Sequence, residues 1–352
     1  MDLLVLAVAL LVILLGAELF TNGIEWVGRK LDLAQGAVGS VLAAVGTALP
    51  ETMIPIIAIV FGTGAHADEV GVGAILGAPF MLATLAMFVT GVGVIGFRRR
   101  RATSTRMVVD TTVLVHDIRY FVIAYAIAIG AAFLPPEVGF LRIGIAVGLV
   151  AIYAWYVKGH FDAEAGDAGE DLVPLRFHGL DRPGLARDPG VPRLRIVYVQ
   201  VVVALACIVG GAYLFVGAVT SLATTLGVSQ LLLALVIAPI ATELPEKFNS
   251  LIWVRQGKDT LAMGNITGAM VFQSAIPTVV VLLLAGDAWQ VTEDSVLAFF
   301  SAAMAFIAVA AIFLPMWRTS RLDGRSLLVG GLVYLVYLVL VILAITGALP
   351  IG

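Results

Sequence analysis

Long apolar stretches separated by short polar ones run along the whole chain. Several of these stretches exceed the roughly 20 residues that an α-helix needs to cross a bilayer. Their lengths predict ten membrane-spanning helices and therefore an all-α polytopic membrane protein. The helices are expected at residues 3–27, 37–62, 70–96, 108–133, 138–157, 195–220, 230–253, 260–284, 295–316 and 326–348.

The composition agrees with a membrane protein and excludes several other classes. Of the 352 residues, 61% are hydrophobic and only 13% are charged. The single Cys207 excludes an internal disulfide and a thiolate metal cluster. No basic segment lies outside the flanks of the expected spans, which argues against nucleic acid as a partner. The first apolar stretch lacks the basic start and cleavage site of a secretory signal, so it is expected to stay as a span.

The distribution of basic residues predicts an orientation. All lysines and arginines except Arg119, Arg142 and Lys247, which is 18 of the 21, fall in the odd-numbered connections. By the positive-inside rule these connections are cytoplasmic, and both termini lie outside. The "FRRRR" run at 97–101 is explained by this rule. The many Arg, Ala, Gly and Val residues suggest a prokaryote, so we expect the protein in its cell (inner) membrane.

The chain is expected to divide into two halves that resemble each other. A polar connection at 159–194, interpreted as a flexible cytoplasmic linker, separates five spans in 1–158 from five in 195–352. "GAELF" at 16–20 recurs as "GAYLF", and "TALPE" at 47–51 recurs as "TELPE", both 195 positions later. Because each half has an odd number of spans, the second half enters the membrane inverted. Such repeats place a substrate site near the bilayer midplane.

The repeated "TxLPE" motif predicts a cation site. Thr47 and Glu51 are four residues apart, as are Thr242 and Glu246, so each pair shares a helix face. The prolines at the fourth position of the motif are expected to kink both helices and free carbonyl oxygens; they are Pro50 and Pro245. Ca²⁺ prefers about six to eight oxygen ligands, and two glutamates with threonine oxygens supply such a set.

At these residues the sequence resembles the cation/calcium antiporters, which include the sodium/calcium exchangers. The resemblance rests on the paired alpha repeats "AVGTALPE" at 44–51 with "VGVGAILGAPF" at 70–80, and "PIATELPE" at 239–246 with "KDTLAMGNITGAMVF" at 258–272. It implies that Glu51 and Glu246 are the central calcium ligands, with oxygens from Thr47 and Thr242. It also implies alternating access, in which spans one and six slide against the other eight.

Some positions depart from the pattern that the resemblance implies. Sodium/calcium exchangers usually carry a serine and then an Asn or Asp after each motif, and these help to bind the ions. The corresponding residues here are Ala78, Leu82, Ala269 and Gln273. Three of the four have no side-chain oxygen, which puts sodium coupling in doubt.

A second charged pair stands next to the second motif. Glu243 and Lys247 are four residues apart, and we expect them to form an ion pair beside the cation site. The pair either takes part in coupling, by replacing a cation or exchanging protons, or only neutralises itself in an aqueous cavity.

Further polar residues in the spans are candidates for smaller roles. Gln273 is a candidate ligand, and Asn265 and Glu18 are candidates for coupling or gating. Asp117, His116 and Arg119 form either a proton route or a local packing network.

Together these features predict a secondary active antiporter that exports Ca²⁺ in exchange for H⁺ or Na⁺. The partners are these ions and the lipid bilayer, with no cofactor and no enzymatic activity expected. The alternatives are an antiporter for another cation, with calcium binding lost or weakened, and a cation channel that uses the carboxylates as a selectivity ring.

Overall fold

A computed structural model describes residues 2–30, 43–62, 67–163, 173–180, 192–346 and 348. The described chain is mostly α-helical. The main helices are α1 (Asp2–Lys30), α2 (Ala43–Phe61), α3 (Ala67–Met81), α4 (Met87–Phe97), α5 (Thr111–Gly130), α6 (Leu141–Ala163), α7 (Leu194–Leu226), α8 (Gln230–Gln256), α9 (Asp259–Leu284), α10 (Val296–Thr319) and α11 (Leu328–Ile345). A π-helical turn, η2 (Leu82–Ala86), joins α3 to α4, so that these three elements form one continuous rod.

Many of these helices are suited to a bilayer. Within the described residues, seven helical segments are long and apolar enough to cross a membrane. Three shorter apolar helices cover Pro50–Phe61, Gln230–Ile240 and Leu328–Ala344. Numerous large apolar side chains are exposed on the helices that contain these segments, as lipid-facing side chains are. The protein is therefore an integral membrane protein of α-helices.

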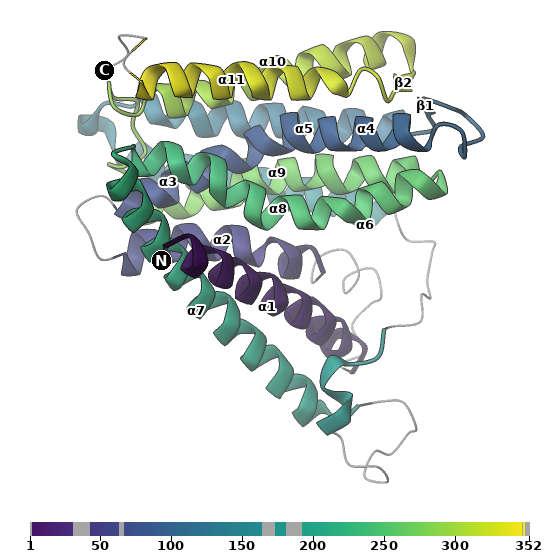
Figure 1. Ribbon diagram of the computed structural model, residues 1–352, viewed down its shortest axis with the longest axis horizontal. Helices are drawn as coiled ribbons and strands as arrows, with labels where there is room; N and C mark the ends of the chain where they lie inside the picture. The colour runs from purple at the N-terminus through teal and green to yellow at the C-terminus, as the bar shows by residue number, and fades with distance from the viewer. Residues whose placement is uncertain are drawn as a thin grey trace.

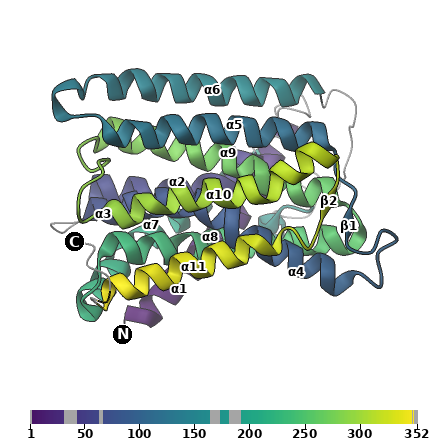
Figure 2. The same ribbon diagram turned by 90° about the horizontal axis from the view of Figure 1, so that it is seen from above.

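The helices lie roughly side by side in layers (Figure 1). α10 and α11 lie at one edge and the pair α1 and α7 at the opposite edge, with α2, α3, α8 and α9 between them. Seen from above, α6 forms a further edge and packs on α5 and α9 (Figure 2). With 33 residues at about 1.5 Å each, α7 is about 50 Å long, and together with α1 it runs obliquely to the remaining helices.

α1 and α7 pack closely and run antiparallel. A Cβ on Gly16 would lie 3.0 Å from the carbonyl oxygen of Ala204, and one on Gly211 would lie 3.1 Å from that of Ala9. The hydroxyl of Ser221 also donates to Asp2 at the far end of the pair. Apart from α7, α1 contacts mainly α2. α1 and α7 therefore form a unit against the rest of the bundle.

α3 and α8 approach even more closely. A Cβ on Gly73 would lie 2.3 Å from the carbonyl oxygen of Leu231, and one on Gly77 would lie 2.1 Å from that of Leu235. Both distances are far below van der Waals contact. The two glycines therefore let the backbones of these helices meet.

We expect Gly77→Ala to destabilise the protein by about 1–3 kcal/mol or more, because the added methyl group meets backbone that cannot rotate away. The measurement is thermal unfolding of the purified protein in detergent. Gly96→Ala is the matched control, since Gly96 lies on the same rod and a Cβ there meets nothing within 4 Å. Equal unfolding temperatures for the two variants would contradict this account of the α3–α8 contact.

Part of the expected flexible linker is held in place. Residues 173–180, which include the short 3₁₀ helix η5 (Arg176–Leu180), lie against α1 and α7. The amide nitrogen of Arg176 donates to Asn22, that of Phe177 donates to Gln200, and the indole of Trp26 donates to the carbonyl oxygen of Val173. The prediction of a linker did not anticipate these contacts, which arise because the segment contains apolar residues such as Leu175 that bury against the helices.

Candidate ion-binding site

The two motif segments lie on helices that meet inside the bundle. Glu51 on α2 is only 7% exposed, and Thr242 on α8 is buried as well. α2 and α8 contact each other, and both contact α9. The hydroxyl of Thr242 donates to the carbonyl oxygen of Ala238 at 3.1 Å, which leaves its oxygen lone pairs available to accept or to bind a cation.

Glu243 has a partner that the sequence did not indicate. Its side chain is 2% exposed, and its carboxylate accepts a hydrogen bond of 2.8 Å from the amide of Gln273 on α9. The spacing along the helix predicted an ion pair with Lys247, whose side chain lies outside the described residues. Gln273, expected near the site, is thus held against an acidic side chain of the motif helix.

The two positions in the first half whose side chains have no oxygen to bind a cation are buried too. Ala78 on α3 and Leu82 at the start of η2 are 3% and 0% exposed. η2 contacts both α8 and α9. π-helical turns occur frequently at functional sites, and this one was not predicted from the sequence. The hydroxyl of Thr84 inside it donates to the carbonyl oxygen of Phe80, so this polar side chain satisfies the local backbone.

A polar network links three helices beside the site. Asp117 on α5 is almost fully buried and accepts hydrogen bonds from Tyr156 on α6 and from Thr267 on α9. The ring of His116 stacks against Tyr156. These contacts match the packing network that was one of the two interpretations of Asp117 and His116. Arg119 makes no contact in this network among those that the described residues show.

The other candidates are placed as follows. Glu18 on α1 is exposed and forms an ion pair of 2.6 Å with Arg176, so it lies at the surface of the α1–α7 unit. Asn265 on α9 is half-buried. Pro50 lies inside α2 without ending it, and the predicted kinks remain predictions. Side chains outside the described residues are those of Thr47, Pro245, Glu246 and Lys247.

No group of three or more His, Cys, Asp or Glu side chains that could hold a metal ion is found among the described residues. The sequence predicts threonine or main-chain oxygens in addition to carboxylates for a cation at the motif segments. Such a mixed set of oxygen ligands suits a hard cation.

Long apolar helices that enclose buried carboxylate and amide side chains are typical of membrane proteins that move ions. The particular family follows from the sequence match. The family model described as "Sodium/calcium exchanger protein" matches residues 1–159 and 196–343, and the chain belongs to this family. It is a membrane antiporter of the sodium/calcium exchanger family, as the resemblance predicted.

Two individual relatives are also similar in sequence to this chain. CaxA of Alkalimonas amylolytica is 24% identical over 340 residues, which is 93% of this chain and 95% of CaxA. The inner membrane protein YrbG of Escherichia coli (strain K12) is 31% identical over 153 residues, or 42% of this chain and 45% of YrbG.

Two solved structures share the fold. The crystal structure of the H⁺/Ca²⁺ exchanger CAX has a TM-score of 0.70 at 18% identity, covering 99% of this chain and 85% of that chain. The sodium-calcium exchanger NCX_Mj has a TM-score of 0.56 at 17% identity, covering 96% of this chain and 99% of that chain. At these identities the likeness is one of fold.

Proposed function

We propose that the protein exports Ca²⁺ across a prokaryotic cell membrane in exchange for another cation, by alternating access at a site around Glu51, Glu246, Thr47 and Thr242. The observation that carries the proposal is the burial of Glu51 and Thr242 on two contacting helices inside the bundle. An ionisable side chain at bilayer depth costs on the order of 2.5–3.5 kcal/mol, so it is retained where it has a function.

The ten-span topology belongs to the same proposal. The seven long apolar helices and the three shorter ones within the described residues support it. Two inverted repeats with both termini outside would place the two motif helices, α2 and α8, in opposite orientations around the ion. Each would then supply one central glutamate.

The surroundings of the site favour H⁺ as the counter-ion over Na⁺. Ala78, Leu82 and Ala269 offer no side-chain oxygen, and Na⁺ needs oxygen ligands. Glu243, a further carboxylate on the second motif helix, is buried against Gln273. Protons need no preformed ligand cage, so the loss of oxygens does not prevent their exchange.

The helices α1 and α7 supply the moving part in this proposal. They pack on each other more extensively than on any other element, and α1 contacts the rest of the bundle mainly through α2. A pair of helices packed mainly on each other can slide as one body against the remaining helices. This movement would expose the site alternately to each side.

The test is ⁴⁵Ca²⁺ uptake into proteoliposomes that contain the purified protein, with an outward H⁺ gradient, an outward Na⁺ gradient or no gradient. We expect the H⁺ gradient to drive Ca²⁺ uptake. The accompanying exit of H⁺ should acidify the external medium at a rate that saturates with the Ca²⁺ concentration. Uptake driven only by Na⁺ would reverse the choice of counter-ion. No uptake under any gradient, with correctly inserted protein, would refute calcium as the substrate, and unsaturable flux without counterflow would indicate a channel.

A further inference from the structure

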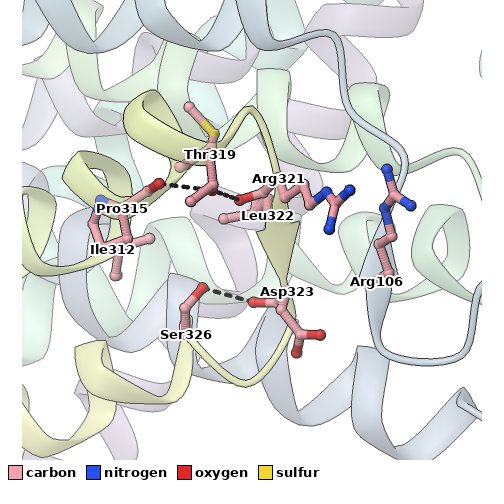
Figure 3. Close-up of a pocket in the computed structure, with 9 residues that line it drawn as sticks. Arg106, Ile312, Pro315, Thr319, Arg321, Leu322, Asp323 and Ser326 are labelled. Atoms are coloured by element: carbon pink, nitrogen blue, oxygen red, sulfur yellow. Dashed lines mark hydrogen bonds between the residues drawn. The ribbon is translucent and has the colours of Figure 1, made fainter.

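A groove lies at the end of α10, away from the candidate ion site. It has a volume of about 550 Å³ and opens between the last turns of α10 and the short sheet of β1 (Arg106–Met107) and β2 (Leu322–Asp323) (Figure 3). Ser320 ends α10 in a left-handed conformation (φ 51°), which turns the chain back along the groove. The lining residues are Arg106, Ile312, Pro315, Met316, Thr319, Arg321, Leu322, Asp323 and Ser326.

One side of the groove is apolar and belongs to a membrane-spanning segment. Ile312, Pro315 and Met316 come from α10, whose whole length, Val296–Thr319, is apolar enough to cross a bilayer. Trp317 on the same turn is 70% exposed. Exposed tryptophans at helix ends mark the boundary between hydrocarbon and headgroups. The groove therefore extends from the hydrocarbon into the headgroup layer.

The other side of the groove carries two arginines. In the antiparallel sheet Arg106 stands opposite Asp323, and Met107 stands opposite Leu322. Arg321 directly precedes β2 and lines the same groove as Asp323 and Arg106. Met107 and Leu322 take the opposite face and are buried. The pairing of β1 with β2 thus brings Arg106 and Arg321 to the same groove.

The remaining polar groups of the groove already have partners. The hydroxyl of Thr319 donates to the carbonyl oxygen of Pro315 at 2.8 Å, and that of Ser326 donates to the carbonyl oxygen of Asp323 at 2.7 Å. The carboxylate of Asp323 accepts from the hydroxyl of Thr105 and from the backbone of Arg325.

The guanidinium groups of Arg106 and Arg321 differ from these partnered groups. Neither forms an ion pair or a side-chain hydrogen bond within the described part of the chain. In Figure 3 the guanidinium groups of Arg106 and Arg321 lie on the same side of the view, and the carboxylate of Asp323 points away from them. Two positive charges that line the same groove repel each other, and an anion bound between them offsets this repulsion. Guanidinium groups bind phosphate oxygens in pairs.

We propose that this groove binds an anionic phospholipid, with the phosphate between Arg106 and Arg321 and an acyl chain along Ile312 and Met316. The apolar side favours a lipid over a free phosphate, because a soluble anion would leave Ile312, Pro315 and Met316 uncovered. The groove lies at the end of the chain's helices where most of its basic residues gather, and the cytoplasmic leaflet is rich in anionic lipid. The lipid would hold the α10–α11 turn against the α4–α5 connection.

The test is native mass spectrometry of the purified full-length protein in mild detergent, titrated with phosphatidylglycerol or with phosphatidylcholine of the same acyl chains. We expect phosphatidylglycerol to be retained preferentially, and Arg106→Gln/Arg321→Gln to weaken its binding roughly tenfold or more. Arg318→Gln/Arg325→Gln is the matched control, since it removes the same charge from exposed arginines of the same turn that do not line the groove. A third arm adds inorganic phosphate as a competitor.

The result expected is a loss of binding in the groove variant alone and no competition by phosphate. Equal loss in both double variants would overturn the proposal in favour of a general attraction to basic surface. Effective competition by inorganic phosphate would overturn it in favour of a site for a soluble anion. Equal retention of the two lipids would also overturn it. Because the measurement is of binding and not of transport, none of these outcomes depends on the proposed calcium export.

Discussion

Replacing Glu51 by glutamine is expected to reduce Ca²⁺ transport by on the order of 100-fold or more. The substitution keeps the size of the side chain and removes its charge at a buried position, 7% exposed, on the first motif helix. Affinity for Ca²⁺ depends on the number of charged ligands, and even indirect changes at metal sites cost about 10–100-fold. The measurement is the initial rate of ⁴⁵Ca²⁺ uptake in proteoliposomes, normalised to the amount of inserted protein.

Glu293→Gln is the matched control for this substitution. Glu293 lies exposed in the connection before α10, and the same change there removes one negative charge from the protein without touching the bundle. We expect it to transport at the rate of the unmodified protein. A Glu51→Gln variant that transports as fast as Glu293→Gln would show that Glu51 is not a ligand and would move the site elsewhere.

The second large effect is expected for Arg101→Met, which should lower the free energy of unfolding by about 3–5 kcal/mol. Arg101 and Asp259 form a buried ion pair, with both side chains 1% exposed and two hydrogen bonds of 2.6 and 2.7 Å. Arg101 also donates to the carbonyl oxygen of Val254 at the end of α8. Without it, the carboxylate of Asp259 stays buried and uncompensated.

This prediction is checked by thermal unfolding in detergent. Arg100→Met is the control, because Arg100 is exposed and belongs to the same run of arginines. Arg101→Met/Asp259→Leu should recover part of the loss, since it removes both charges together. If Arg101→Met unfolds at the same temperature as Arg100→Met, the ion pair does not stabilise the connection between α4 and α5 against α8 and α9.

Much of the candidate site was accessible to sequence reasoning. The repeated motif identified Glu51 and Thr242, and the structure places both in the interior on contacting helices. Gln273 was found because it departs from the family pattern, and it lies buried on α9. Roles for these residues remain predictions, as do those of Glu246 and Lys247. The contact of Glu243 with Gln273 was not predicted, because a spacing of four along one helix indicates a local pair and gives no sign of an amide on another helix.

The sequence by itself determined the class of apolar helical membrane protein and the family, and it predicted the two related halves, because these depend on local composition and on repeated motifs. Only the tertiary structure decided which polar residues meet. Within "FRRRR", spacing and charge do not distinguish Arg101 from its neighbours, yet Arg101 alone reaches Asp259, 158 residues later. Glu18 similarly meets Arg176 at the surface, also 158 residues away. The periodicity of a sequence reports which face of a helix is apolar, whereas contacts between distant segments depend on how the helices pack.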